Sequence, residues 1–243
     1  MSVERLYLEN GSVVIRKVMT EDRFADAEEL VSIFGQRIDA PVPIVLRTDA
    51  RELYMELMPG RPAGLVLPGL SAEAAAPYVR TVGGLLLGVI DAATANDDRH
   101  EFNWQISDGG LVWGIDHASV DVEDGVENDD GIMLPGAGSS SSPFAEHWLV
   151  RNSSWEETWK TNALHPLDAE RLIKQAISMQ GEFQARGYDH WWLVIVKRLE
   201  AIEEYAKGET PWLKPRQAAR PTILGECNSR SSKSTDHSAR PSK

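Results

Sequence analysis

The first hydrophobic pattern along the chain alternates with polar positions, as β-strands with one buried face do. Residues 4–18 carry two such runs on either side of Asn10-Gly11, a pair that favours a tight turn, so they are expected to form a β-hairpin. Residues 44–46 and 53–57 are expected to form a second antiparallel pair, and Met58-Pro59-Gly60 would end this sheet.

Two further stretches repeat apolar residues at the spacing of an α-helix. In residues 24–38 these residues share one face, and Pro41-Val42-Pro43 would stop the helix. Residues 78–90 predict a second amphipathic helix, with Ser71-Ala72-Glu73 as a candidate start. Residues 61–72 are rich in Gly and Pro and are expected to form a linker.

The helix over 78–90 leads into a polar stretch that begins at Asn96. Short apolar runs follow over residues 104–106 and 111–115, on either side of Ser107-Asp108-Gly109-Gly110. Apolar runs around a Gly-rich turn predict a second hairpin, and Asp116 comes directly after it.

Beyond Asp116 the sequence turns acidic over residues 121–130 and then rich in Gly and Ser over 131–142. A solvated loop is the simpler interpretation, and an acidic wall that attracts a cationic substrate is the alternative. Helical spacing returns from Pro143 onward, most clearly in residues 167–187 and 188–206.

Residues 208–243 are rich in Ser, Pro, Lys and Arg and contain few apolar positions. Such a segment buries too little surface to offset the entropy lost on ordering, so we expect a disordered basic tail. From Lys214 onward the chain has seven basic and two acidic residues, which gives this segment a net charge of +5. Because the whole chain carries −12, residues 1–213 carry −17. An acidic body repels nucleic-acid phosphates and anionic lipid surfaces, which counts against both as partners.

The composition is that of an ordinary globular protein, 42% hydrophobic over 243 residues, and it allows one bilobal domain or two small ones. No segment approaches the roughly 18–20 continuous apolar residues of a membrane span, and the N-terminus lacks the features of a signal peptide. Cys227 is the only cysteine, which excludes an internal disulfide and a cysteine-based zinc site. We therefore expect a cytoplasmic protein.

Three residues in the middle of the chain have the spacing that phosphoryl transfer needs. Asp98 lies five residues before Asn103, and Asp116 lies thirteen residues after Asn103. In kinases one carboxylate takes the proton of the attacking hydroxyl, while an Asn and a second Asp hold the Mg²⁺ ions that bridge the phosphates of ATP. Asp98 is therefore the candidate catalytic base, and Asn103 and Asp116 are the candidate magnesium ligands. His100 has no Cys or His partner at ligand spacing, so we expect it to orient the loop through a hydrogen bond.

The kinase signature H-R-D-x-x-x-x-N followed by D-F-G has the same Asp-to-Asn step. More closely, Asn-x-Asp-Arg before Asn-Trp, and then Gly-Ile-Asp, resembles the phosphatidylinositol 3-/4-kinase-like superfamily, especially its type II phosphatidylinositol 4-kinase branch. The pattern N-x-D-x-H-x-x-N, formed here by Asn96, Asp98, His100 and Asn103, is similar to that of HipA-type protein kinases. The layout most resembles small bacterial kinase-like proteins related to both, over roughly residues 4–207.

This resemblance implies an α+β, protein-kinase-like bilobal fold, with a small β-rich N-lobe over residues 1–60 and a mainly helical C-lobe over 61–207. It also implies a hinge, in which backbone groups of Glu56, Leu57 and Met58 would read the adenine of ATP.

A kinase N-lobe further carries a strand lysine that grips the α- and β-phosphates and pairs with a helix glutamate. Strand alternation alone leaves both Arg16 and Lys17 open, and the family layout favours Lys17. Glu28 and Glu29 both remain candidates for its partner, with Glu28 preferred. Arg99, like the arginine of the related motif, is expected to neutralise charge near the loop.

The resemblance implies ATP and Mg²⁺ as cofactors and a hydroxyl-bearing acceptor, for which a small molecule or a protein or peptide Ser/Thr is favoured over a lipid. A cationic acceptor would suit the acidic body. Only sixteen residues precede Lys17, and Gly11 is the only glycine among them, so the expected Gly-rich phosphate loop is not found. Either the phosphates are held in another way, or the true start lies upstream, or the N-lobe is degenerate. A catalytically impaired pseudokinase, acting as a nucleotide-binding or scaffolding module, is therefore the alternative to an active kinase.

Overall fold

The structure, a computed structural model, describes residues 1–67, 72–96, 98–120, 122, 144 and 169–206. Several sequence predictions fall outside these residues: the acidic and Gly/Ser-rich stretches up to residue 142, the helical spacing just after Pro143, and the tail of 208–243. Contacts between Cα atoms group Met1–Leu213 in one unit and Lys214–Lys243 in another, so every described element belongs to the first unit.

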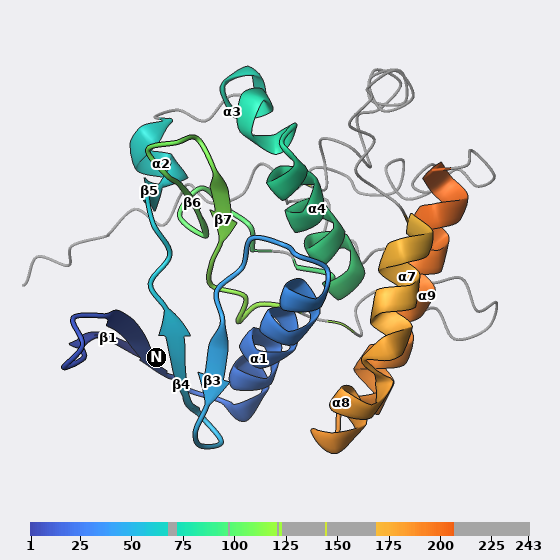
Figure 1. The fold of residues 1–243 in the computed structure, drawn as a ribbon, viewed down its shortest axis with the longest axis horizontal. Coiled ribbons are helices and arrows are strands. Elements are labelled where there is room, and N and C mark those ends of the chain that lie inside the picture. Colours follow the sequence, from blue (N-terminus) through green and yellow to red (C-terminus); the bar gives the residue numbers. More distant parts are fainter. Residues whose placement is uncertain (68–71, 97, 121, 123–143, 145–168, 207–243) are drawn as a thin grey trace, which may run out of the picture. The chain divides into compact units, whose positions relative to one another are not determined.

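The first sheet has four antiparallel strands in the order β1-β2-β4-β3. Their bounds are Ser2–Tyr7 for β1, Val13–Val18 for β2, Val45–Arg47 for β3 and Glu52–Glu56 for β4. Gly11 has a φ of 82° in the turn between β1 and β2, a conformation that glycine adopts without steric cost. Both strand pairs predicted for the first 60 residues are confirmed, and Figure 1 shows β3 beside β4.

A second, three-stranded sheet has the order β5-β6-β7, with β5 at Arg61–Pro62, β6 at Trp104–Ile106 and β7 at Val112–Gly114. The predicted hairpin of β6 and β7 is confirmed. The prediction of a linker from residue 61 is wrong, because β5 pairs with β6 and the short helix α2 follows at Ala63–Val66. A Cβ at Gly60 would lie 2.4 Å from the carbonyl oxygen of Ile106, so a glycine here lets the chain approach β6 closely.

The helices α1 (Asp22–Arg37), α3 (Ala72–Val79) and α4 (Val82–Thr94) follow the predicted apolar spacing with one correction. The expected continuous helix over 78–90 breaks at Thr81, whose side chain accepts a hydrogen bond of 3.0 Å from Gly84 N and caps α4. A Cβ at Gly84 would lie 2.6 Å from the carbonyl oxygens of Tyr78 and Val79, so glycine permits this tight junction.

The C-terminal helices are α7 (Ala169–Ser178), α8 (Gln180–Ala185) and α9 (Asp189–Ala206). The single helix expected over 167–187 is therefore broken at Met179, whose backbone N–H bonds to Ala176 in a tighter turn than that of an α-helix. Gly187 closes this region as predicted, with a φ of 78°. Figure 1 shows α7 alongside α9, and the two helices are in contact.

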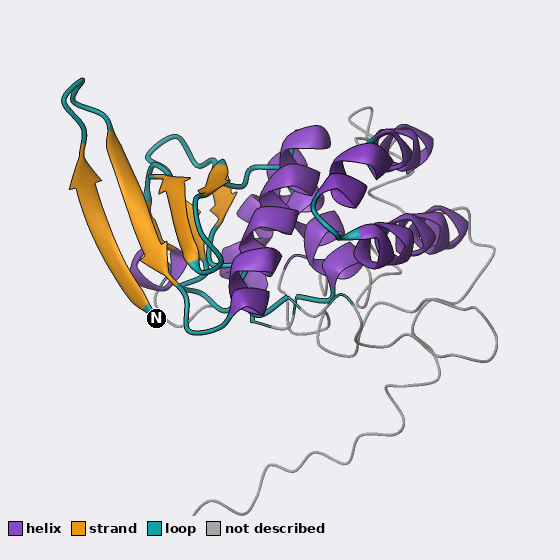
Figure 2. Ribbon diagram, turned by 90° about the horizontal axis from the view of Figure 1, so that it is seen from below, coloured by secondary structure: helices purple, strands orange, loops and turns teal. Residues whose placement is uncertain are grey.

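One large apolar core joins α1 and α4 to β6, β7 and the C-terminal helices, and it includes Phe34, Leu87, Trp104, Phe183 and Leu199. A smaller cluster of Met19, Ala25 and Leu53 packs α1 against the four-stranded sheet. The described unit is therefore a mixed α+β structure with small antiparallel sheets, and Figure 2 shows its strands on one side and the helices on the other. Within the described residues, no helix is both long and apolar enough to cross a membrane.

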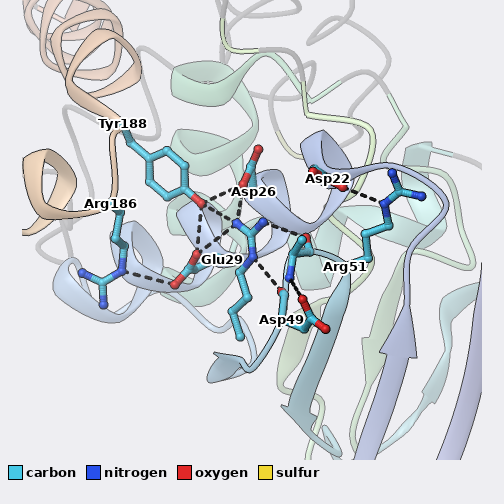
Figure 3. A network of polar contacts seen from close by, with 9 residues as sticks. Asp22, Asp26, Glu29, Asp49, Arg51, Arg186 and Tyr188 are labelled. Carbon is cyan, nitrogen blue, oxygen red and sulfur yellow. Dashed lines mark hydrogen bonds and ion pairs between the residues drawn. The ribbon is translucent and has the colours of Figure 1, made fainter.

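A polar network fastens α1 to β3 and to the turn between α8 and α9 (Figure 3). The Tyr188 hydroxyl lies 3.0 Å from both Asp26 Oδ1 and Glu29 Oε2, and it accepts a hydrogen bond of 2.9 Å from Arg47 Nη1. Arg47 also pairs with Asp26, and Arg186 pairs with Glu29. Burial and the two neighbouring carboxylates raise the pKa of Tyr188, so its hydroxyl remains a donor at physiological pH.

Tyr188→Phe should therefore lower the free energy of unfolding by about 1–2 kcal/mol, because it removes a buried donor and leaves Arg47 with one acceptor fewer. Urea denaturation followed by circular dichroism measures this change. Tyr7→Phe is the matched control, since the Tyr7 side chain is exposed on β1 and its variant should unfold like the wild type. Equal stability of the Tyr188→Phe variant and the wild type would show that the network contributes nothing.

Candidate active site

Lys17 of β2 lies at the centre of the candidate site. Its Nζ lies 2.5 Å from Glu28 Oε1 on α1 and 3.1 Å from Asp116 Oδ1 beyond β7. The side chain of Lys17 is 7% exposed and that of Glu28 is fully buried. Its neighbour Arg16 points to the opposite face of the strand, where it pairs with Glu4 and Glu52.

The same geometry distinguishes Glu28 from Glu29, since Glu29 turns away toward Arg186 and Tyr188. Burial lowers the pKa of Lys17, but the opposing charges of Glu28 and Asp116 outweigh it, so the net shift is upward and the ammonium stays protonated. The second carboxylate oxygen of Glu28, Oε2, is buried without a hydrogen-bond partner in the described part of the chain. Lys17 is therefore the group that compensates this buried charge.

Asp116 reaches Lys17 from a segment 99 residues further along the chain. Its backbone has a φ of 56°, in the left-handed region that non-glycine residues seldom adopt and that Asp tolerates better than most. This turn directly after β7 aims the carboxylate at Lys17, and the side chain stays 34% exposed. Asp116 can therefore contact both the buried lysine and a ligand in solvent.

Arg99 holds together the two segments that carry Asn103 and Asp116. Its guanidinium pairs with Asp91 of α4 at 2.9 Å, and both side chains are fully buried. The same group donates hydrogen bonds to Asn103 O at 2.5 Å and to Ile115 O at 2.8 Å. Because a guanidinium is rigid and planar, these bonds fix the distance between the two backbones.

Asn103 is 5% exposed, and its side-chain amide faces Asp98. Asn103 Nδ2 donates to the Asp98 backbone oxygen at 2.7 Å and lies 3.2 Å from Asp98 Oδ2. With Nδ2 engaged as the donor, Oδ1 is the atom left to ligate a cation. The Asp98 carboxylate is 47% exposed and lies within reach of a ligand in solvent.

Two histidines support this loop in different ways. His100 Nδ1 accepts a hydrogen bond of 3.1 Å from Phe102 N, which confirms the expected loop-orienting role. His117 is buried beside Arg99, and burial together with the positive charges of Arg99 and Lys17 lowers the pKa of His117 well below its ordinary value. Arg99 Nη2 lies 2.8 Å from His117 Nδ1, and a guanidinium can only donate a hydrogen bond. Nδ1 is therefore the acceptor, and the neutral ring carries its proton on Nε2.

The residues expected to form a hinge lie between the two sheets. Glu56 ends β4 and is paired with Val14, whereas Leu57 and Met58 come after the strand pairing and lead to β5. Met58 is buried at 5% exposure. The structure thus places these three residues on the connection between Lys17's sheet and the sheet of β6 and β7.

The donor set of Asn103 and Asp116 suits Mg²⁺, which prefers oxygen ligands and is often held by one or two carboxylates together with substrate phosphates. Among the described residues, no group of three or more His, Cys, Asp or Glu side chains is arranged to hold a metal ion by itself. A metal at this site would therefore need further oxygen ligands, such as the phosphates of a nucleotide or water.

No family model matches the chain, and no curated protein matches it.

Asp91 and His117 are site residues that the sequence analysis missed. Asp91 had a signal, because it is the one charged residue of the otherwise apolar helix α4, and a buried charge needs a partner. Apart from its position next to Asp116, nothing in the sequence indicated His117, because its contact partner Arg99 lies 18 residues earlier in the chain.

Lys17→Met should destabilise the protein by about 3–5 kcal/mol, the usual cost of leaving the partner of a buried ion pair uncompensated. Adding Glu28→Gln to Lys17→Met should restore part of this loss, because the orphaned charge is removed. The measurement is the free energy of unfolding in urea. Arg16→Met is the control on the same strand, and its half-exposed pairs should cost at most about 1 kcal/mol. Similar losses for Lys17→Met and Arg16→Met would contradict the buried ion pair.

Proposed function

We propose that the chain is an ATP-dependent phosphotransferase that moves the γ-phosphate of ATP to a hydroxyl group, within a protein-kinase-like arrangement of a strand-rich and a helical lobe. The observation that carries this proposal is the contact of Lys17 with both Glu28 and Asp116, from elements 11 and 99 residues away. Arg99 supports it, because it joins Asn103 to the segment of Asp116.

Each residue then has one role. Lys17 would hold the phosphates of ATP through its buried ammonium, and Glu28 would keep that ammonium in place. Asn103 and Asp116 would hold Mg²⁺, which neutralises charge that develops on the phosphates. Asp98 would take the proton of the acceptor hydroxyl, and Glu56, Leu57 and Met58 would contact the adenine through their backbone.

The pseudokinase remains as the second candidate because of the turn between β1 and β2. Leu8 N bonds to Ser12 O at 2.8 Å, Gly11 N to Leu8 O at 2.9 Å, and Ser12 N to Asn10 Oδ1 at 2.9 Å. These N–H groups are used within the turn itself. A phosphate-binding loop instead points such groups at the nucleotide, so phosphate binding would depend on Lys17 and the metal ligands.

When the Mg·ATP concentration is a hundred times its Kd, binding should stabilise the wild-type chain by about 2.7 kcal/mol, measured as a thermal shift. Asp116→Asn should lose this shift in the presence of Mg²⁺, because the carboxylate ligand is removed while its size is kept. Asp108→Asn is the control, since Asp108 is exposed in the turn between β6 and β7. An unchanged Mg·ATP shift in the Asp116→Asn variant would remove Asp116 from the site.

Asp98→Asn should separate catalysis from binding. It should keep the Mg·ATP shift but lower the rate of phosphate release from ATP, with water as the acceptor, by roughly 10²–10⁴-fold, because Asn cannot take a proton. The Asp108→Asn variant should turn over like the wild type. Binding without phosphate release in the wild type would favour the pseudokinase, and equal release by the Asp98→Asn variant would exclude Asp98 as the base.

A further inference from the structure

Ser119 lies three residues beyond Asp116, and its hydroxyl lies against the proposed catalytic base. Ser119 Oγ is 3.4 Å from Asp98 Oδ2. Within the described residues, Ser119 is the hydroxyl side chain that hydrogen-bonds to Asp98. A general base must lie within hydrogen-bond reach of the proton that it takes, and this serine meets that condition in the free protein.

We propose that Ser119 is a phosphate acceptor of this chain, modified by its own active site in cis. This inference rests on the proposed phosphotransferase function, and it names one acceptor for that site. The distance of 3.4 Å is longer than the usual 2.7–2.8 Å of an O–H···O bond, as catalytic contacts often are before the substrate complex forms.

The backbone on both sides of this contact is held in place. Val120 forms an antiparallel bridge with Asn96, and Val120 N bonds to His117 O at 3.2 Å. Asn96 in turn accepts a hydrogen bond from Asp98 N at 3.1 Å and donates one to Asp91 at 2.9 Å. The residue after Ser119 is therefore joined to a residue that also anchors Asp98, so the serine lies near the base because of ordered structure.

The polar groups around Asp98 leave its side chain partly exposed. Asn103 Nδ2 and the Ser119 hydroxyl both approach the same oxygen, Oδ2, and His100 Nε2 is 3.8 Å from the other oxygen. The Asp98 side chain is about half exposed, and Ser119 is partly exposed. Within the described residues, both the proposed base and the proposed acceptor are therefore accessible from solvent.

The transfer balances with ATP as the only co-reactant. The bond between Ser119 Oγ and the γ-phosphorus forms, and the bond from that phosphorus to the oxygen bridging to the β-phosphate breaks, so ADP leaves. The hydroxyl proton passes to Asp98 and from there to solvent. The product carries about −1.5 to −2 charges beside the Asp98 carboxylate, and its hydroxyl has been consumed in the ester bond. The reaction should therefore stop at one phosphate per chain at this site.

The test incubates the full, phosphatase-treated chain with γ-labelled ATP and Mg²⁺, and fragment mass spectrometry assigns the phosphate. We expect phosphate on Ser119, with a fractional rate that stays constant on tenfold dilution because the reaction is intramolecular. Ser119→Ala should lose it while keeping the Mg·ATP thermal shift, and Ser119→Thr should carry it on the threonine. Ser107→Ala is the control and should remain phosphorylated at Ser119, because Ser107 lies in the turn between β6 and β7, where it accepts from Leu111 N.

The other outcomes overturn the inference in distinguishable ways. Mg·ATP binding with phosphate only at other residues, or with no phosphate on the chain, would reject Ser119 as the acceptor and leave the proposed function standing. A fractional rate that falls with dilution would reject transfer in cis. Absence of both Mg·ATP binding and phosphate transfer would reject the inference together with the proposed function.

Discussion

The compensation of one buried positive charge is the constraint on which the candidate site depends. An ammonium removed from water needs carboxylates close by, and Lys17 finds them on α1 and on the segment after β7. These partners come from parts of the chain that are far apart in sequence. The pair therefore requires that the four-stranded sheet, α1 and the loop of Asp116 keep fixed positions against one another.

Polar contacts on the other sides of these elements meet that requirement. Asp26 and Glu29 flank Glu28 on α1 but face Arg47 and Tyr188, so one side of the helix serves the site and another side anchors the helix. The loop of Asp116 is anchored by Arg99, which pairs with Asp91 and donates a hydrogen bond to Ile115 O. A substitution at either anchor would therefore shift Glu28 or Asp116 relative to Lys17, although the substituted residue itself need not contact a ligand.

Local patterns predicted most strands and helices, because each depends on neighbours within a few residues. They missed the breaks at Thr81 and Met179, where one residue stops a helix whose apolar spacing continues past it. For the site, the spacing of Asp98, Asn103 and Asp116 was visible in the sequence. Strand alternation left Arg16 and Lys17 open, the family layout favoured Lys17, and the orientation of β2 against α1 decides for Lys17. The contact of Ser119 with Asp98 left no signal, since no periodic pattern links a loop residue to another 21 positions away.

The combination of unfavourable features around Lys17 argues that this cluster has a role other than stability. Buried ion pairs such as Lys17–Glu28 and Asp91–Arg99 can often be replaced by apolar residues with little loss or even a gain in stability. Asp116 adds a left-handed backbone, and Glu28 Oε2 and His117 Nε2 are buried polar atoms without a hydrogen-bond partner in the described chain. Such features also occur elsewhere in the described chain, as the positive φ of Asp39 and the buried, unpaired Trp104 Nε1 show, but around Lys17 they come together with two buried ion pairs. A combination of backbone strain and buried charge at one set of side chains is typical of a site that is arranged for a ligand.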